Sequence, residues 1–272
     1  MKQTSGYAWE LALIGTTAAV AVAGFWNLYA GGSAAPDSYH HLHVTTNFAW
    51  LTLLFYQATQ LRNGNFQDHR RMGLLVLVLG PLLVASTALL SVHSARKGIE
   101  SGQGDFLIIQ NVGVTLELAL LIVAAFVVRK RRKLHGSFLM GSVLLFFGIA
   151  LFFTLISFAP PFKIEGPETF YRFATAGMAG NIVCFLIGLA FFFRDWRNGW
   201  PMLIAGVLFP LNDFVGGLLD SQDLIGPLTM AVASLNQPLT YAGTFLVLLA
   251  ALLATGVLRG RTRPERIPVQ GA

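Results

Sequence analysis

The six histidines of this 272-residue chain are its main candidates for metal binding or proton transfer. They all lie in the first half of the sequence, close to points where apolar segments begin or end: His40, His41, His43, His69, His93 and His135. Imidazole titrates near neutral pH, and it is a common ligand of zinc, copper, iron and haem iron. The histidines therefore favour a redox or metal-linked function, although their spacing matches no specific catalytic signature.

The segment Tyr39–His43 contains three histidines and is the strongest metal candidate. We expect His93 to lie on the same side and face of the membrane as this segment. We predict His43 and His93 as ligands of haem b or a transition metal, with His40 or His41 as a substitute ligand. The alternative is that these histidines are ordinary polar groups at a wet interface.

A polar stripe continues from this histidine run into the apolar segment 44–62. Its residues recur at alternating steps of three and four, which places them on one face of a helix. They are His40, His43, Asn47, Trp50, Leu54, Gln57 and Leu61. Such a face should point into a helix bundle and could hold a cofactor or relay protons. It could also only join helices by hydrogen bonds worth about 0.6 kcal/mol each.

Two carboxyl groups inside apolar segments are candidates for proton or ion transfer. Glu117 shares a helical face with Gln110 and Gly113, and a lone carboxyl at that depth is expected to hold its proton or to relay it. Asp213 follows Pro210, which predicts a broken helix of the kind found in transporter sites. The alternative role for both groups is hydrogen bonding between helices.

The remaining histidines, His69 and His135, each stand beside a basic cluster at the start of an apolar segment. They could bind a cofactor, or they could contact the phosphate groups of lipids. Cys184 is the only cysteine, so neither an intrachain disulfide nor a thiolate metal cluster can form.

The composition predicts an all-α, polytopic membrane helix bundle. The chain is 54% hydrophobic and only 12% charged, whereas a soluble domain carries about 25% charged residues. Because a span needs about 20 apolar residues, we predict about eight spans, with seven as the alternative around residues 199–238. The spans are 9–30, 44–62, 72–93, 106–128, 137–159, 172–193, 199–219 and 239–258. Residues 1–258 would form one bundle, and 259–272 a short basic cytoplasmic tail.

The basic residues predict how this bundle is oriented. Most of them lie in the second, fourth and sixth connections and in the C-terminal tail. The positive-inside rule then places both termini in the cytoplasm. His40, His41, His43 and His93 would lie at the outer face, and His69 and His135 at the inner face. The net charge of +6 is divided among these connections, so it does not indicate nucleic-acid binding.

The polar stripe, the sequence His69-Arg70-Arg71-Met72-Gly73 and the pair His135-Gly136 resemble bacterial multi-span membrane families of unknown function. The resemblance covers about residues 40–160. It implies a protein of the bacterial inner membrane with a haem or respiratory association, similar to b-type cytochromes or oxidase-assembly proteins. Quinone or a respiratory complex would then be a partner beside the lipid bilayer. The b-type pattern buries histidines within spans, whereas His69, His93 and His135 lie at span ends.

Three functions remain open at this stage. The first is a membrane oxidoreductase or metal-binding protein that uses the histidines, with Glu117 as a proton relay. The second is a transporter of ions or small solutes lined by Glu117 and Asp213, with the short apolar segment 224–235 as a re-entrant or surface element. The third is a non-catalytic assembly factor in which the same polar residues only pack helices.

Overall fold

The computed structural model describes residues 7–31, 34–102 and 104–257, and these residues form helices and connecting turns without a β-strand. The all-α fold class is therefore confirmed for the described chain. The basic tail that we predicted at 259–272 lies outside the described residues. The helices are α1 (Ala8–Gly24), α2 (Trp26–Ala30), α3 (Ser38–Arg62), α4 (Phe66–Met72), η1 (Gly73–Leu75), α5 (Val76–Glu100), α6 (Ile108–Val127), α7 (Arg132–Phe158), η2 (Pro167–Thr169), α8 (Arg172–Arg194), α9 (Trp200–Asp220), α10 (Ile225–Ser234) and α11 (Gln237–Ala254).

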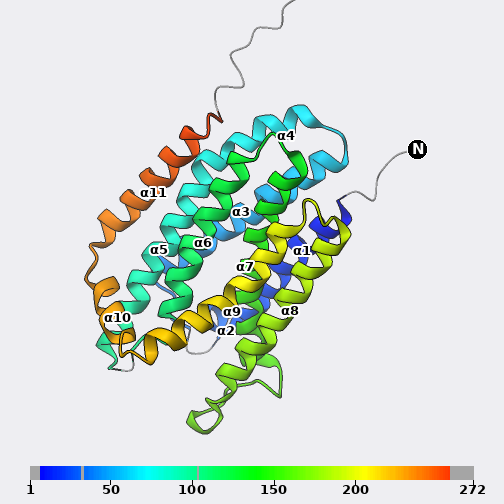
Figure 1. The fold of residues 1–272 in the computed structure, drawn as a ribbon. Helices are drawn as coiled ribbons and strands as arrows, with labels where there is room; N and C mark the ends of the chain where they lie inside the picture. The colour runs from blue at the N-terminus through cyan, green and yellow to red at the C-terminus, as the bar shows by residue number, and fades with distance from the viewer. Residues whose placement is uncertain (1–6, 32–33, 103, 258–272) are drawn as a thin grey trace, which may run out of the picture.

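The long helices pack side by side into one bundle (Figure 1). α5 contacts α3, α6, α10 and α11, and α7 contacts α1, α6, α8 and α9. These two helices also carry the largest sets of buried residues. The bundle is therefore organised around α5 and α7.

The bundle has two ends, which we name after the short helices that lie there. The α4 end also holds the start of α1, the start of α7 and the last turn of α11 (Figure 1). The α10 end also holds α2, the start of α3 and the connection between α7 and α8. The first described turn of the chain and the last one thus lie at the same end, whereas their side of the membrane stays a prediction.

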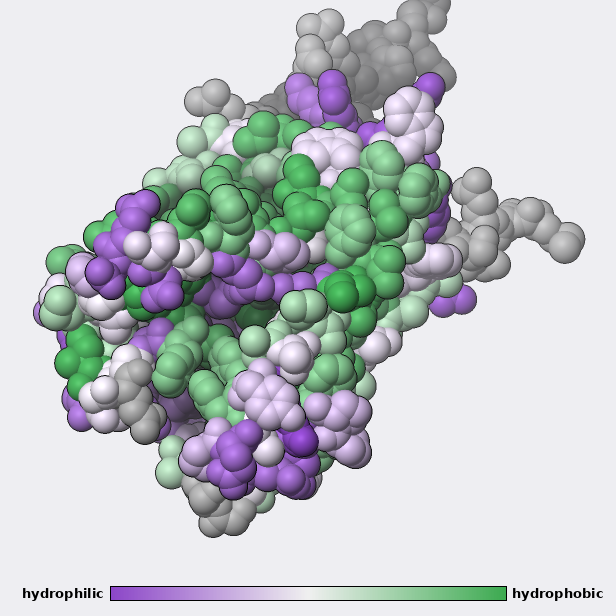
Figure 2. All heavy atoms as spheres, turned by 60° about the horizontal axis from the view of Figure 1, so that its bottom comes forward, coloured by the Kyte–Doolittle hydropathy of each residue, from purple (hydrophilic) through white to green (hydrophobic). Residues whose placement is uncertain are grey.

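Within the described residues, six helical segments are long and apolar enough to cross a membrane. They are Phe66–Glu100, Ile108–Val127, Arg132–Phe158, Pro167–Arg194, Trp200–Asp220 and Gln237–Ala254. Large apolar side chains such as Leu120, Val247 and Phe193 are about 70% exposed, as expected for surfaces that face lipid. Figure 2, which views the α10 end, shows hydrophobic flanks and a hollow with hydrophilic side chains at its edge.

Of the eight spans that we predicted, the last six coincide with these segments, and the first two stay open. α1 has 17 residues and ends at Phe25, where the chain starts the short helix α2. α3 has 25 residues, enough to cross, but it is not among the six apolar segments. The polar stripe that we predicted on α3 lowers its hydropathy. Trp50, Leu54 and Gln57 of that stripe are buried, so it does face the bundle.

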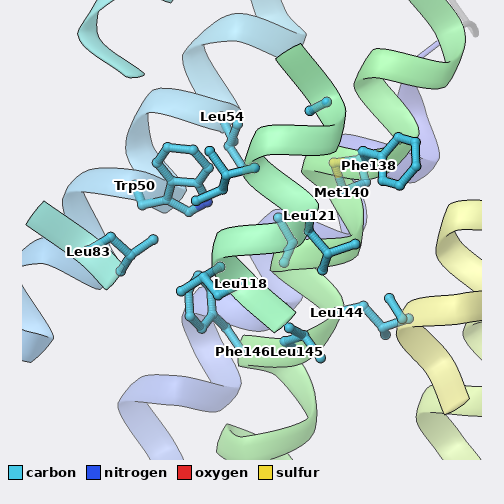
Figure 3. Packing of buried hydrophobic residues seen from close by; sticks show 14 of the residues in the cluster. Trp50, Leu54, Leu83, Leu118, Leu121, Phe138, Met140, Leu144, Leu145 and Phe146 are labelled. Atoms are coloured by element: carbon cyan, nitrogen blue, oxygen red, sulfur yellow. The ribbon is translucent and has the colours of Figure 1, made fainter. Parts of the chain in front are cut away.

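The centre of the bundle is apolar and tightly packed (Figure 3). Leu83 of α5, Leu118 of α6 and Leu144 of α7 have no exposed surface. Trp50 is also fully buried, and its indole N–H donates a hydrogen bond of 3.0 Å to the hydroxyl of Ser142. A buried indole N–H needs an acceptor, and this bond links α3 to α7.

Two predictions about helix shape are wrong. We expected a broken helix at Pro210, but α9 continues from Trp200 to Asp220 with Pro210 inside it. Proline removes only one backbone hydrogen bond, and neighbouring helices can support a membrane helix across that gap. We also expected His93 to end its span, but α5 continues to Glu100, about two turns further.

Arginine side chains hold the two C-terminal helices, α10 and α11, against the bundle. At the α10 end, the guanidinium group of Arg96 donates to the carbonyls of Ala233, at 2.8 Å, and Leu235, at 2.7 Å. At the α4 end, Arg129 donates to the carbonyls of Thr255 and Gly256. Both arginines satisfy carbonyl groups that a helix end leaves without intrahelical partners. The segment that we expected to be too short to cross is the ten-residue helix α10.

Candidate functional site

The candidate metal site begins at the first turn of α3, where Asp37 caps the helix. The carboxylate oxygen Oδ1 accepts hydrogen bonds from the backbone N–H groups of Tyr39, at 3.0 Å, and His40, at 3.3 Å. Aspartate is a preferred residue at this position because it satisfies N–H groups that the helix leaves free. The His40 ring reaches back, and its Nδ1 lies 2.8 Å from Asp37 Oδ1.

His93 from α5 completes this group. Its Nε2 atom lies 2.9 Å from Oδ2 of Asp37, so the carboxylate stands between two imidazoles. That Nε2 is buried, and its contact with Asp37 is a close approach without the geometry of a hydrogen bond. Tyr39 stacks on the His93 ring at 4.8 Å between centroids, and its hydroxyl donates to Gln237 at 2.8 Å. Helices α3, α5 and α11 thus hold His93 in place.

Asp37, His40 and His93 offer three ligand atoms that all lie within 4.8 Å of one another. This is the one group of three or more histidine, cysteine or acidic ligands that could share a metal ion among the described residues. The three side chains are between 21% and 39% exposed, so water reaches the group. We call Asp37, His40 and His93 the outer triad.

The electrostatics of the outer triad keep its acid ionised. Burial of Asp37 raises the pKa of its carboxyl group, but the His40 backbone N–H and the two imidazoles lower it more. The net pKa is below the ordinary value of 3.8. Asp37 is therefore a carboxylate at neutral pH, which is the form that binds metal ions.

Two of the predicted outer ligands lie outside the triad. The His41 ring packs edge-on against Tyr29, with the ring centroids 5.5 Å apart. Nε2 of His43 lies 3.0 Å from the side-chain nitrogen of Asn47, one turn further along α3. Nδ1 of His43 is buried and has no hydrogen-bond partner within the described chain. The structure thus joins His40 with His93, and places His43 deeper along the same helix.

The two remaining histidines, His69 and His135, lie near the α4 end and within electrostatic range of each other. Nδ1 of His135 bonds with the carbonyl oxygen of Ala125 at 2.7 Å, and its ring packs edge-on against Phe126. With its amide group turned to satisfy its neighbours, Gln57 donates to both the backbone carbonyl and Nδ1 of His69. Both rings are thus held by contacts within the bundle, and their role in cofactor binding stays a prediction.

Asp213 and Glu117 belong to a second polar group, which joins α6, α8 and α9. Asp213 accepts hydrogen bonds of 2.6 Å from the amides of Gln110 and Asn181. Asn212 donates to the amide oxygen of Gln110 at 3.2 Å and also interacts with the carboxyl group of Glu117. We call these five side chains the polar chain. The polar chain connects Glu117 with Asp213, the two acids predicted from the sequence. None of its five members is a histidine.

Sequence reasoning missed two members of these groups. Asp37 stands directly before the helix that carries the histidine run, a position typical of a capping aspartate, and this signal could have found it. Asn181 is the polar residue in the middle of an otherwise apolar stretch of α8, so its place in the sequence also marked it. The pairing of each with a distant helix depends on the packing of the bundle.

Comparison with known proteins found no family model, no curated protein and no solved structure that matches this chain.

Proposed function

We propose that this chain is an integral membrane protein that binds one transition-metal ion through the outer triad. The observation that carries the proposal is the convergence of Asp37, His40 and His93, whose ligand atoms lie within 4.8 Å of one another. Two imidazoles and one carboxylate form a ligand set that suits zinc or iron. The charge distribution of the connections supports an outward-facing site in a bacterial inner membrane.

The geometry favours a single ion over haem. Haem with two histidine ligands needs imidazoles on opposite faces of a large porphyrin ring. The His40 and His93 rings instead meet edge to face, with centroids 5.6 Å apart, and both approach the same carboxylate. That arrangement leaves a place for an ion at the carboxylate.

The chemistry at this site depends on the ion. Three protein ligands leave at least one coordination position for water or a substrate, as in catalytic zinc sites and in iron sites with two histidines and one carboxylate. Iron would support the redox role and electron exchange with quinone that the resemblance implies. Zinc would support a Lewis-acid or metal-transfer role, since it has no redox chemistry.

The first test measures metal binding to the full chain in detergent or nanodiscs. We expect one Zn²⁺ or Co²⁺ to bind per chain, and His93→Ala or His40→Ala to weaken binding by about a hundredfold, or about 2.8 kcal/mol. Metal content after gentle purification, together with an absorption spectrum, identifies the natural ion and tests for haem. Binding should weaken as the pH falls, because protonated imidazole cannot coordinate a metal.

Two variants control this experiment. His41→Ala removes a histidine of the same helical turn that lies outside the outer triad, so metal affinity should stay unchanged. Asp37→Asn keeps a side chain that caps helices well but removes the charge, so it should weaken binding while α3 stays folded. The proposal fails if the native chain binds no metal, or if His93→Ala binds as tightly as His41→Ala does.

A further inference from the structure

The two acids of the polar chain, Asp213 and Glu117, have different environments. Asp213 is exposed, and each of its carboxylate oxygens accepts a short hydrogen bond from an amide. Glu117 is only 9% exposed, and its Oε2 has no hydrogen-bond partner in the described chain. When the environments of two titratable groups differ in this way, one group holds the charge and the other the proton. Asp213 is the charged member of this pair.

The charged groups on the helices around Glu117 do not change this assignment. The helices packed against α6 are α5, α7, α9, α10 and α11. Their charged or titratable groups nearest the α10 end are Asp213, Asp220, His93, Arg96, Lys97, Glu100 and Tyr241, and Asp105 precedes α6. Arg96 donates to α10 carbonyls, and Asp105 accepts from Asn111. Lys133 and His135 lie at the start of α7, at the opposite end. Among the described residues, Asn212 is the polar side chain that acts on Glu117.

An ionised Glu117 would thus be a buried charge without a cation beside it. Burying an unpaired charge costs several kcal/mol, and a buried carboxyl avoids this cost by holding its proton. A neutral carboxyl can donate that proton to the amide oxygen of Asn212. The backbone permits this contact because α6 has Gly113 there, where an added Cβ would lie 2.6 Å from the Asn212 oxygen.

The polar chain also indicates from which end of the bundle protons reach the Glu117 carboxyl. Gln110 lies in the first turn of α6 at the α10 end, and Glu117 follows seven residues later, about 10 Å deeper. Towards the α4 end the next residues of α6 are apolar, and Leu118, Leu121 and Ile122 are buried. Asp213, which accepts a hydrogen bond from Gln110, is exposed at this end.

We propose that Glu117 is a proton-binding site that exchanges protons with the aqueous phase at the α10 end, along the polar chain. Asp213 lies nearer the α10 end, and its negative charge favours the protonated form of Glu117. The buried leucines beyond Glu117 separate this site from the α4 end. A site that is protonated from one side of the membrane is the element that a proton-coupled carrier requires. This role is independent of metal binding at the outer triad.

Dicyclohexylcarbodiimide tests the proposal directly, because this apolar reagent attaches to protonated carboxyl groups in apolar surroundings. The full chain is incubated with it in nanodiscs across a range of pH, and the modified peptides are measured by mass spectrometry. We expect Glu117 to be modified at a rate that decreases as the pH rises, and Asp213 to remain unmodified near neutral pH. Glu117→Gln should remove the modification, and Glu117→Asp keeps a carboxyl in case the first variant does not fold.

The interaction between Asp213 and Glu117 allows a quantitative test. Asp213 lies next to Asn212, which interacts with Glu117, so its charge acts on the Glu117 carboxyl. Asp213→Asn should therefore move the midpoint of Glu117 modification to lower pH by about one unit. Asp220→Asn, which removes an exposed carboxyl from the last turn of the same helix, should leave the midpoint in place.

Three outcomes would overturn the proposal. The first is that Glu117 is never modified in a folded chain, and the second is that its modification is independent of pH. The third is that Na⁺ or K⁺ protects Glu117 at fixed pH and ionic strength, which would make a metal cation the ligand. Zn²⁺ affinity should be the same in Glu117→Gln and the native chain, so this proposal and that for the outer triad can fail separately.

Discussion

At the scale of single residues, Asp37 shows how one side chain can serve both folding and function. Its carboxylate caps α3 and also lies between the imidazoles of His40 and His93. The sequence predicted the histidines, because their side-chain chemistry is specific. It did not predict the partner of His93, because that contact joins residues 56 positions apart and exists only once α3 and α5 have packed.

Asp195 offers a test of residue-scale electrostatics away from both proposed sites. It lies between α8 and α9 and accepts hydrogen bonds from Lys133 at 3.1 Å and from the Asn198 amide at 3.0 Å. Partial burial raises the pKa of its carboxyl, but Lys133 and Asn198 lower it further, to below the ordinary value of 3.8. Because this pKa is lowered on folding, the carboxylate stabilises the fold above about pH 4 and loses that effect as the pH falls.

We therefore predict that Asp195→Asn flattens the acid end of the stability profile. Near neutral pH the variant should lose at most about 1 kcal/mol, since a partly exposed pair is screened by solvent. Below about pH 4 the melting temperatures of variant and native chain should converge. Thermal unfolding in detergent at a series of pH values measures this. Asp68→Asn, a partly exposed acid of α4, is the control, and parallel profiles for Asp195→Asn and the native chain would refute the prediction.

At the scale of helices, α8 and α9 pack through small residues. The buried residues of α8 recur every four positions and are Ala176, Gly180, Cys184 and Gly188. An added Cβ at Gly188 would lie 2.5 Å from the carbonyl oxygen of Met202, and one at Gly206 would lie 2.8 Å from that of Cys184. Small residues at such spacing let membrane helices approach closely. This pattern was visible in the sequence, but its partner helix was not.

Gly188→Ala should destabilise this crossing. The atom that a new methyl group would meet is backbone, which cannot rotate away, so the helices must separate. Overpacking of this kind costs about 1–3 kcal/mol, and we expect a lower melting temperature in detergent. Gly177→Ala is the matched control on the same helix, because an added Cβ there meets nothing within 4 Å. Equal melting temperatures for the two variants would show that the helices do not approach as closely as described.

At the scale of the whole molecule, the sequence predicted the class of architecture better than the number of spans. Apolar runs separated by charged connections specify membrane helices, because a bilayer leaves few other ways to satisfy the backbone. The ambiguity concerns α1 and α3. α1 is short, and α3 carries the polar residues that the bundle buries, so length and hydropathy alone cannot decide whether they cross. The packing of α1 on α7 and of α3 on α5 favours crossing.

Single cysteines can decide between six and eight spans. Ala35 is exposed and precedes α3, Glu100 ends α5, and Lys130 lies between α6 and α7. If both α1 and α3 cross, Ala35→Cys lies on the same side as Glu100→Cys. If neither crosses, Ala35→Cys lies on the same side as Lys130→Cys, which is the side where α5 begins. The native chain serves as the blank, because its cysteine, Cys184, is buried.

We expect a membrane-impermeant maleimide to label Ala35→Cys and Glu100→Cys in intact cells, and Lys130→Cys only after the cells are opened. The structure requires the first two positions to agree, because Asp37 contacts His93 two turns before the end of α5. If Ala35→Cys instead behaves like Lys130→Cys, the eight-span arrangement is wrong. If all three positions react on the opposite side, the bundle is inverted. The outer triad and the entrance to Glu117 would then face the cytoplasm, so this experiment also fixes the side on which both proposed sites meet their ligands.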